Sequence, residues 1–87
     1  MRLVRNTTPD GSCKYRVWNN ERQAWVEDDG PGGENEFFVI MVKDRHAQAA
    51  LMAYACSASE TDMEFASDVF ELAQRAGPAS PFCKDPD

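Results

Sequence analysis

The sequence predicts an α+β fold, in which an N-terminal antiparallel β-meander of three or four short strands packs against a C-terminal helical hairpin. Two observations predict it. Apolar and polar residues alternate with a period of two in the first third of the chain, which is typical of strands. In the second half, apolar residues recur at helical spacing. Since the chain has 87 residues, of which 43% are hydrophobic, we expect a single folded domain over residues 1–87.

The meander is expected to occupy residues 1–27. The segment Thr8–Gly11 has the residues of a tight turn, because proline presets φ and glycine accepts a positive φ. This turn separates a short strand at Arg2–Arg5 from a second strand over Cys13–Trp18. A polar connection leads to a further strand over Gln23–Glu27, so the last two strands predict a hairpin.

A glycine-rich loop is expected over residues 28–36. It resembles phosphate-binding loops in composition only, because no Gly-Lys-Ser/Thr sequence follows and two aspartates precede the glycines. We therefore interpret it as a linker. The next segment, Phe37–Val42, is apolar on both faces and rich in strand-forming residues. We predict a strand over residues 37–43, although periodicity does not distinguish a central strand from the buried start of a helix.

Residues 44–77 are expected to form two helices. The first would span about Arg45–Ser57, after an N-terminal cap at Asp44. Its apolar stripe consists of Ala47, Ala50, Leu51, Tyr54 and Ala58. Small residues lie almost all round this helix, so neighbouring helices can approach it closely on more than one side. We therefore expect a homo-oligomer whose interface contains Ala47, Ala50, Leu51 and Tyr54.

The second helix would span about Asp62–Ala76. Thr61 and Glu64 fit a capping box at its start, and Gly77 with the following proline fits its end. Residues 78–87 contain three prolines and no periodicity, so we predict an extended tail.

Charge and hydropathy exclude several classes of partner. The formal net charge is −6, from nine basic and fifteen acidic residues, which argues against bulk binding to nucleic acid or to an acidic membrane surface. The longest apolar run is far shorter than the ~20 residues that span a bilayer. The N-terminal residues lack the apolar core of a signal sequence. We expect a soluble, cytoplasmic protein.

Reactive side chains are few. The cysteines Cys13, Cys56 and Cys83 are odd in number and form no Cys-x-x-Cys pair, so we expect reduced thiols. Together with His46 they lack the paired spacing of a zinc site, and we predict neither a metal nor a cofactor. His46 and Cys56 are ten residues apart on one predicted helix, or about 15 Å, which is too far for a catalytic pair unless the pair forms between two chains.

The predicted hairpin carries the candidate binding residues, which combine basic and aromatic side chains: Lys14, Arg16, Trp18, Arg22 and Trp25. Alternation places Lys14, Arg16 and Trp18 on one face. Three interpretations remain open. The residues can form a protein-interaction surface, since Trp and Arg are enriched among interface anchors. They can stack on a nucleotide and meet its phosphate. Alternatively, one tryptophan covers the core and the basic residues pair with Glu27 or the acidic helices.

The stretches Phe37–Arg45, Ala50–Ala55, Leu72–Pro78 and Pro81–Asp87 resemble small, uncharacterised accessory proteins of tailed phages, and the resemblance covers residues 37–87. It contains no catalytic motif and transfers no functional residue. It implies a non-enzymatic, phage-encoded protein that binds a host or phage protein in the bacterial cytoplasm. The alternative is an oligomeric sponge that sequesters a cyclic nucleotide signal of host defence, and the third class is a small enzyme that uses His46 or a cysteine thiolate.

Overall fold

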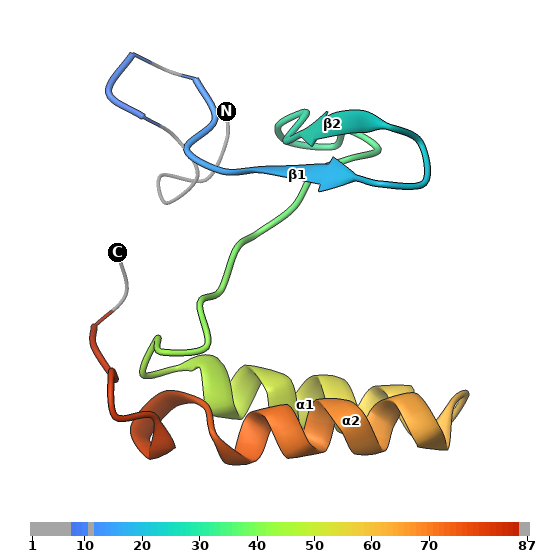
Figure 1. Cartoon of the computed structure of the whole chain (residues 1–87), viewed down its shortest axis with the longest axis vertical. Helices are drawn as coiled ribbons and strands as arrows, with labels where there is room; N and C mark the ends of the chain where they lie inside the picture. The colour runs from blue at the N-terminus through green and yellow to red at the C-terminus, as the bar shows by residue number, and fades with distance from the viewer. Residues whose placement is uncertain (1–7, 11, 86–87) are drawn as a thin grey trace. The chain divides into compact units, whose positions relative to one another are not determined.

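The computed structural model describes residues 8–10 and 12–85, and it confirms the α+β class (Figure 1). Its elements are β1 (Arg16–Asn19), β2 (Ala24–Glu27), α1 (Ala47–Ala58), α2 (Met63–Gln74) and the short 3-10 helix η2 (Gly77–Ala79). The chain divides into two compact units, Met1–Val39 and Ile40–Asp87, which we call the hairpin unit and the helical unit. The packing of the sheet against the helices within one domain stays a prediction.

The hairpin unit contains the two strands, which pair antiparallel. Residues directly opposite each other project from the same face of a sheet. The register therefore creates two faces: one carries Arg16, Trp18, Trp25 and Glu27, and the other carries Val17, Asn19, Ala24 and Val26. Each strand is shorter than predicted at its N-terminal end, but the predicted hairpin is confirmed.

Local hydrogen bonds close the connection between β1 and β2. The side-chain oxygen of Asn19 accepts from the backbone N–H of Arg22 at 3.0 Å. Gln23 has a φ of +54°, and its side-chain amide donates to the Asn20 carbonyl at 2.5 Å. A side chain that returns to the loop backbone in this way supports a left-handed conformation that non-glycine residues rarely adopt.

The strand predicted over residues 37–43 is wrong, since none of these residues lies in a strand. The carbonyls of Met41 and Val42 instead accept hydrogen bonds from the N–H groups of Asp44 and Gly77, each at 2.9 Å. Strand-forming side chains favour a pleated surface but do not supply a strand to pair with. The strand predicted at Arg2–Arg5 lies outside the described residues, so a meander of three or four strands is not confirmed.

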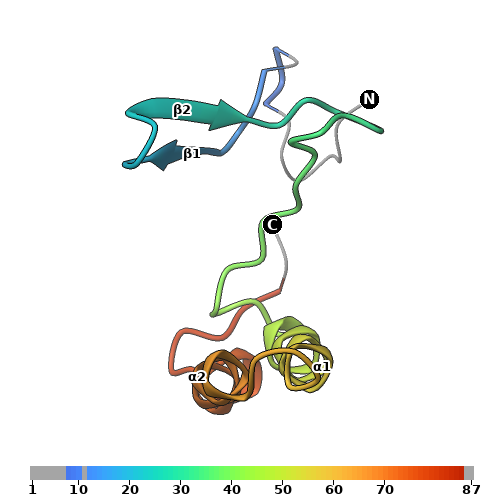
Figure 2. The same cartoon turned by 90° about the vertical axis from the view of Figure 1, so that its right-hand side faces the viewer.

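The helical unit is built on a close contact between α1 and α2, which lie side by side in both views (Figures 1 and 2). Its buried apolar residues are Ala47, Ala55, Ala66, Val69, Ala73 and Ala76. Because nearly all of them are alanines, the two backbones can approach closely. The Gln48 side-chain amide donates to the Ala73 carbonyl at 3.0 Å and joins the two helices directly.

Both helices lie within two residues of their predicted bounds, but their caps differ from the prediction. The Asp44 carboxylate accepts from the N–H of His46 at 2.8 Å, which forms a turn before α1 and does not cap it. In α2 the cap is Asp62, whose carboxylate accepts from the N–H of Phe65 at 3.0 Å. The Thr61 hydroxyl, which was expected to serve as the cap, donates to the Ala58 carbonyl. Any short polar side chain can occupy a cap, so the sequence alone did not decide between neighbours.

The segment after α2 returns along the chain that enters α1. The N–H of Lys84 donates to the Lys43 carbonyl at 3.0 Å, and the N–H of Arg45 donates to the Lys84 carbonyl at 2.9 Å. An ion pair between Arg45 and Asp85 at 3.0 Å lies beside them. The extended tail predicted over residues 78–87 is wrong at its start, because Gly77–Ala79 form η2 and the N–H of Cys83 donates to the Ser80 carbonyl at 3.2 Å. Lys84 attaches this segment to the start of α1. Within the part of the chain that the structure describes, no helix has the length and apolarity needed to cross a membrane.

We predict that Gly77→Ala destabilises the helical unit by about 1–3 kcal/mol. Gly77 has a φ of +58°, and a Cβ there would lie 3.1 Å from the Arg45 carbonyl oxygen. Urea denaturation followed by circular dichroism at the helical band measures the change. Gly32→Ala is the control, since Gly32 also has a positive φ, of +78°, but has open space around it and lies in the hairpin unit. An unchanged urea midpoint for Gly77→Ala would contradict the predicted close approach.

Candidate functional site

The exposed face of the β-hairpin combines two tryptophans with an ion pair, and we call its residues Arg16, Trp18, Trp25 and Glu27 the tryptophan face. Trp18 and Trp25 are cross-strand partners. Their ring centroids are 5.3 Å apart, with an angle of 71° between the planes. Edge-to-face packing of this kind contributes about 0.5–1.5 kcal/mol beyond the burial of area. Each ring therefore holds the other in place.

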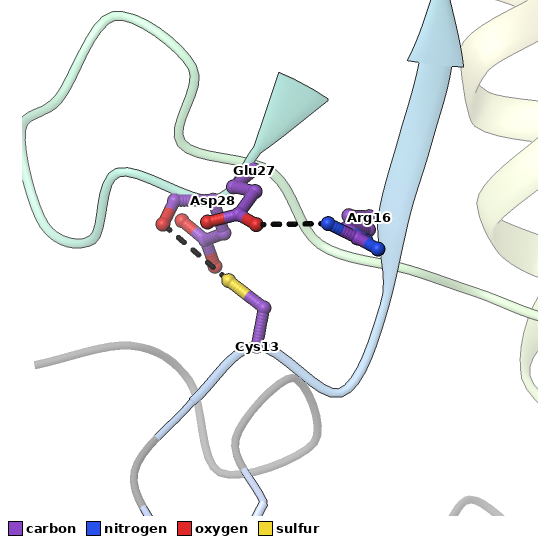
Figure 3. Close-up of polar contacts among 4 residues, drawn as sticks. All are labelled: Cys13, Arg16, Glu27 and Asp28. Atoms are coloured by element: carbon purple, nitrogen blue, oxygen red, sulfur yellow. Dashed lines mark hydrogen bonds and ion pairs between the residues drawn. The ribbon is translucent and has the colours of Figure 1, made fainter. Parts of the chain in front are cut away.

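Arg16 is held on this face by two interactions. Its guanidinium carbon lies 4.2 Å from the centre of the Trp25 ring. One of its nitrogens lies 3.3 Å from a carboxylate oxygen of Glu27, its cross-strand partner (Figure 3). An exposed ion pair contributes at most about 1 kcal/mol, and an exposed cation–π contact contributes a similar amount. Together these contacts place the guanidinium over the Trp25 ring and beside Glu27.

The tryptophan face is open in the described structure. Trp18 is 41% exposed and Trp25 is 51% exposed, so neither ring is buried in a core. These exposures describe the hairpin unit by itself, and the interpretation in which one tryptophan covers the core stays a prediction. The pairing of Arg16 with Glu27, which that interpretation also predicted, is present.

The other two predicted binding residues lie outside the paired strands. Lys14 precedes β1, and its ammonium lies 5.4 Å from the centre of the Tyr15 ring. Arg22 lies in the loop between β1 and β2 and is exposed. Strand register therefore places Arg16, Trp18 and Trp25 together, whereas Lys14 and Arg22 flank them.

Contacts of Cys13 and of the buried Asp28 hold the chain directly after β2 (Figure 3). The thiol of Cys13 donates to the Asp28 carbonyl at 3.7 Å. Asp28 is buried, and its carboxylate accepts from the N–H of Gly30 at 2.9 Å. These contacts anchor the end of β2, and Glu27 is its last residue. Sequence reasoning proposed Glu27 only as a possible ion-pair partner, although its place opposite Arg16 follows once the register is known.

The reactive residues are distributed over different elements. All three cysteines are free; Cys13 is half-buried, whereas Cys56 and Cys83 are exposed. His46 is the exposed residue directly before α1. Among the described residues, no group of three His, Cys, Asp or Glu side chains is close enough to hold a metal ion.

The predicted oligomer interface on α1 is only partly accessible. Ala47 is 0% exposed in the single chain, and its place in that interface stays a prediction. Ala50 and Leu51 are half-buried. Tyr54 is exposed and packs edge-to-face on Phe65, with ring centroids 6.1 Å apart.

Sequence reasoning missed an apolar groove between α1 and α2, which we call the helical groove. Its volume is about 420 Å³, and it is lined by Met52, Ala55, Cys56, Ser59, Met63, Ala66, Ser67 and Phe70. The lining contains no Lys, Arg, His, Asp or Glu. The sequence does contain a signal for this groove, because residues at positions i, i+4 and i+7 lie on one side of a helix. Two sets have this spacing: Met52, Cys56 and Ser59 at α1, and Met63, Ser67 and Phe70 on α2.

No family model, curated protein or solved structure matches the chain. The tryptophan face presents two aromatic planes and a fixed cation, and the helical groove presents uncharged, mostly apolar side chains. Such surfaces suit non-covalent recognition, because aromatic and arginine side chains contribute large contact energies at low entropic cost.

We predict that Asp10 titrates well below an ordinary aspartate. Hydrogen bonds from the Ser12 and Thr8 hydroxyls and the Ser12 N–H lower the pKa of Asp10 from 3.8 to about 2. These contacts stabilise the charged form. Their contribution to stability is therefore complete above the unfolded pKa and is lost as the pH falls through the folded pKa. An NMR titration of the Asp10 carboxyl carbon measures the midpoint.

Ser12→Ala is the matched variant, because it removes the hydroxyl that lowers the pKa of Asp10 most, whose oxygen lies 2.6 Å from the carboxylate. It should move the midpoint back towards 3.8, the ordinary value. A wild-type midpoint already at the ordinary value would show that the turn does not hold Asp10 in this way.

Proposed function

We propose that the chain is a non-enzymatic binding protein that recognises a protein partner through its tryptophan face. The observation that carries the proposal is the exposed, mutually packed pair of Trp18 and Trp25 with Arg16 fixed above one ring. Tryptophan and arginine are the residues most enriched among the few that dominate interface energies. Because the contacts within the hairpin already restrict these side chains, a partner would find them close to one conformation.

The position of Arg16 favours a protein over a nucleotide. Its guanidinium already covers one face of the Trp25 ring, where a base would stack. The same guanidinium is paired with Glu27, so a phosphate would have to compete with that carboxylate. A protein can instead contact the ring edges and pair with both charges at once. Sequestration of a nucleotide by an oligomer is the alternative function.

The cellular setting is part of the proposal. The resemblance to tailed-phage accessory proteins supports a phage origin, and with it a host or phage protein as partner in the bacterial cytoplasm. The proposed function is binding without a chemical reaction. Binding of this kind requires a complementary surface and no reactive side chain.

The direct test compares the two faces of the β-hairpin. We expect the immobilised chain to retain a specific bacterial or phage protein, and the double variant Trp18→Ala and Trp25→Ala to lose it. Truncation of a central tryptophan typically weakens binding by about 2 kcal/mol or more, which is roughly 30-fold in Kd. Affinity for the purified partner is measured by isothermal titration calorimetry.

Val17→Ala is the control, because Val17 is 53% exposed on the opposite face of β1. It should keep the partner, and all variants should keep their helical circular dichroism. A folded double variant that binds the partner with wild-type affinity would show that the tryptophan face is not the site.

The nucleotide alternative gives a different result. We expect cyclic nucleotides to leave the melting temperature unchanged, whereas a tight ligand must raise it by linkage. A rise of several degrees in a thermal-shift screen, lost in Trp25→Ala, would support the sponge and argue against the protein partner.

A further inference from the structure

Sulfur-containing side chains are concentrated at the helical groove. Three of its eight lining residues carry sulfur, namely Met52, Cys56 and Met63, although the whole chain has only three cysteines and four methionines among its 87 residues. Packing of the core does not account for them, because Met63 is 69% exposed and Cys56 is exposed as well. The groove therefore brings one thiol and two thioethers to the same surface of the helix pair.

The two helices hold these three side chains on a fixed base. Met52 and Cys56 are four residues apart on α1, so they are neighbours on one side of it, with Cβ atoms about 5–6 Å apart. Met63 is the first residue of α2 and lines the groove from the other helix. Ala55 and Ala66 also line the groove and are buried, at 4% and 5% exposure. Since methionine has three rotatable bonds, both thioethers can turn towards the thiol without movement of the backbone.

The chemistry of the donors decides which metal ion suits this surface. Thiolates and thioethers are soft ligands that select copper(I), whereas magnesium and calcium require oxygen ligands and structural zinc takes four cysteine or histidine ligands. Charge gives the same answer. Copper(I) and one thiolate are neutral together, which suits a groove whose lining has no ionisable residue other than Cys56. A divalent ion there would keep one unpaired positive charge.

We propose that the helical groove binds one copper(I) ion through the Cys56 thiolate and the thioethers of Met52 and Met63. The thiol releases its proton to water as the copper–sulfur bond forms, and no electron is transferred because the ion enters and remains as copper(I). The exposed thiol gives the ion a path from solvent. The sequence-based prediction of no metal rested on the spacing of the cysteines and His46, and it did not include methionine as a ligand.

Competition with bicinchoninate, a chelator that is coloured when it holds copper(I), measures this site in the full chain in the absence of oxygen. We expect the wild type to retain one copper(I) ion per chain and Cys56→Ser to retain none. Cys83→Ser is the matched control, because Cys83 is also a free, exposed thiol but does not line the groove. This control should bind copper(I) with the wild-type Kd.

The thioethers are tested by replacement with leucine, which keeps the apolar volume of methionine but has no sulfur. Met52→Leu and Met63→Leu should each raise the copper(I) Kd at least about tenfold, since even the outer partners of metal ligands contribute that much. Met41→Leu is the control, because Met41 is 42% exposed but lines a different groove. Circular dichroism verifies that every variant is folded.

A wild type that loses all copper(I) to bicinchoninate would overturn the proposal, and so would equal loss in Cys56→Ser and Cys83→Ser. Wild-type affinity in either leucine variant would contradict a site with three sulfur ligands. Half an ion per chain would show that copper joins two copies instead of the two helices of one chain. Zinc(II) should be absent from the chain after gel filtration of an equimolar mixture, and its retention would contradict the assignment to copper(I).

The copper site is independent of the proposed function. The groove lies in the helical unit, and the tryptophan face lies in the hairpin unit. The double variant Trp18→Ala and Trp25→Ala should therefore bind copper(I) as the wild type does, and Cys56→Ser should keep the protein partner. Failure of one proposal is in this way distinguished from failure of the other.

Discussion

The contact between α1 and α2 through alanine side chains is the constraint on which the helical unit depends. Small residues allow the helices to approach closely, and the bond from Gln48 to the Ala73 carbonyl joins them at one end. Gly77 permits a further close approach, since its N–H reaches the Val42 carbonyl where a Cβ would crowd Arg45. The same closeness leaves no room inside for Met or Phe, and these side chains lie at the surface.

The hairpin unit displays its large side chains for a different reason. A two-stranded sheet has two faces and no second layer of its own, so cross-strand pairs stabilise it. The tryptophan pair and the Arg16–Glu27 pair hold each other in register. The same cross-strand contacts that stabilise the hairpin hold the Trp18 and Trp25 rings and the Arg16 guanidinium at the surface of the hairpin unit. In the hairpin unit, a partner would therefore contact side chains that cross-strand contacts already hold in place.

Sequence patterns predicted the helices and the tryptophan pair, because both depend on local periodicity and on turn residues. They did not predict that Phe37–Val42 lacks a pairing strand, since strand propensity says nothing about the partner. They also missed the helical groove. Because α1 is apolar nearly all round, its periodicity did not show which side faces α2, and the stripe with Ala47 was assigned to an interface although Ala47 is buried.

The central claim is that the isolated chain displays its large aromatic and methionine side chains. Hydroxyl-radical footprinting with mass spectrometry tests it most directly, at a dilution where sedimentation finds single chains. We expect Trp18, Trp25, Met63 and Phe70 to be oxidised at rates typical of solvent-exposed side chains. Protection of these residues in the single chain would contradict the account, because it would show that the chain buries them against itself.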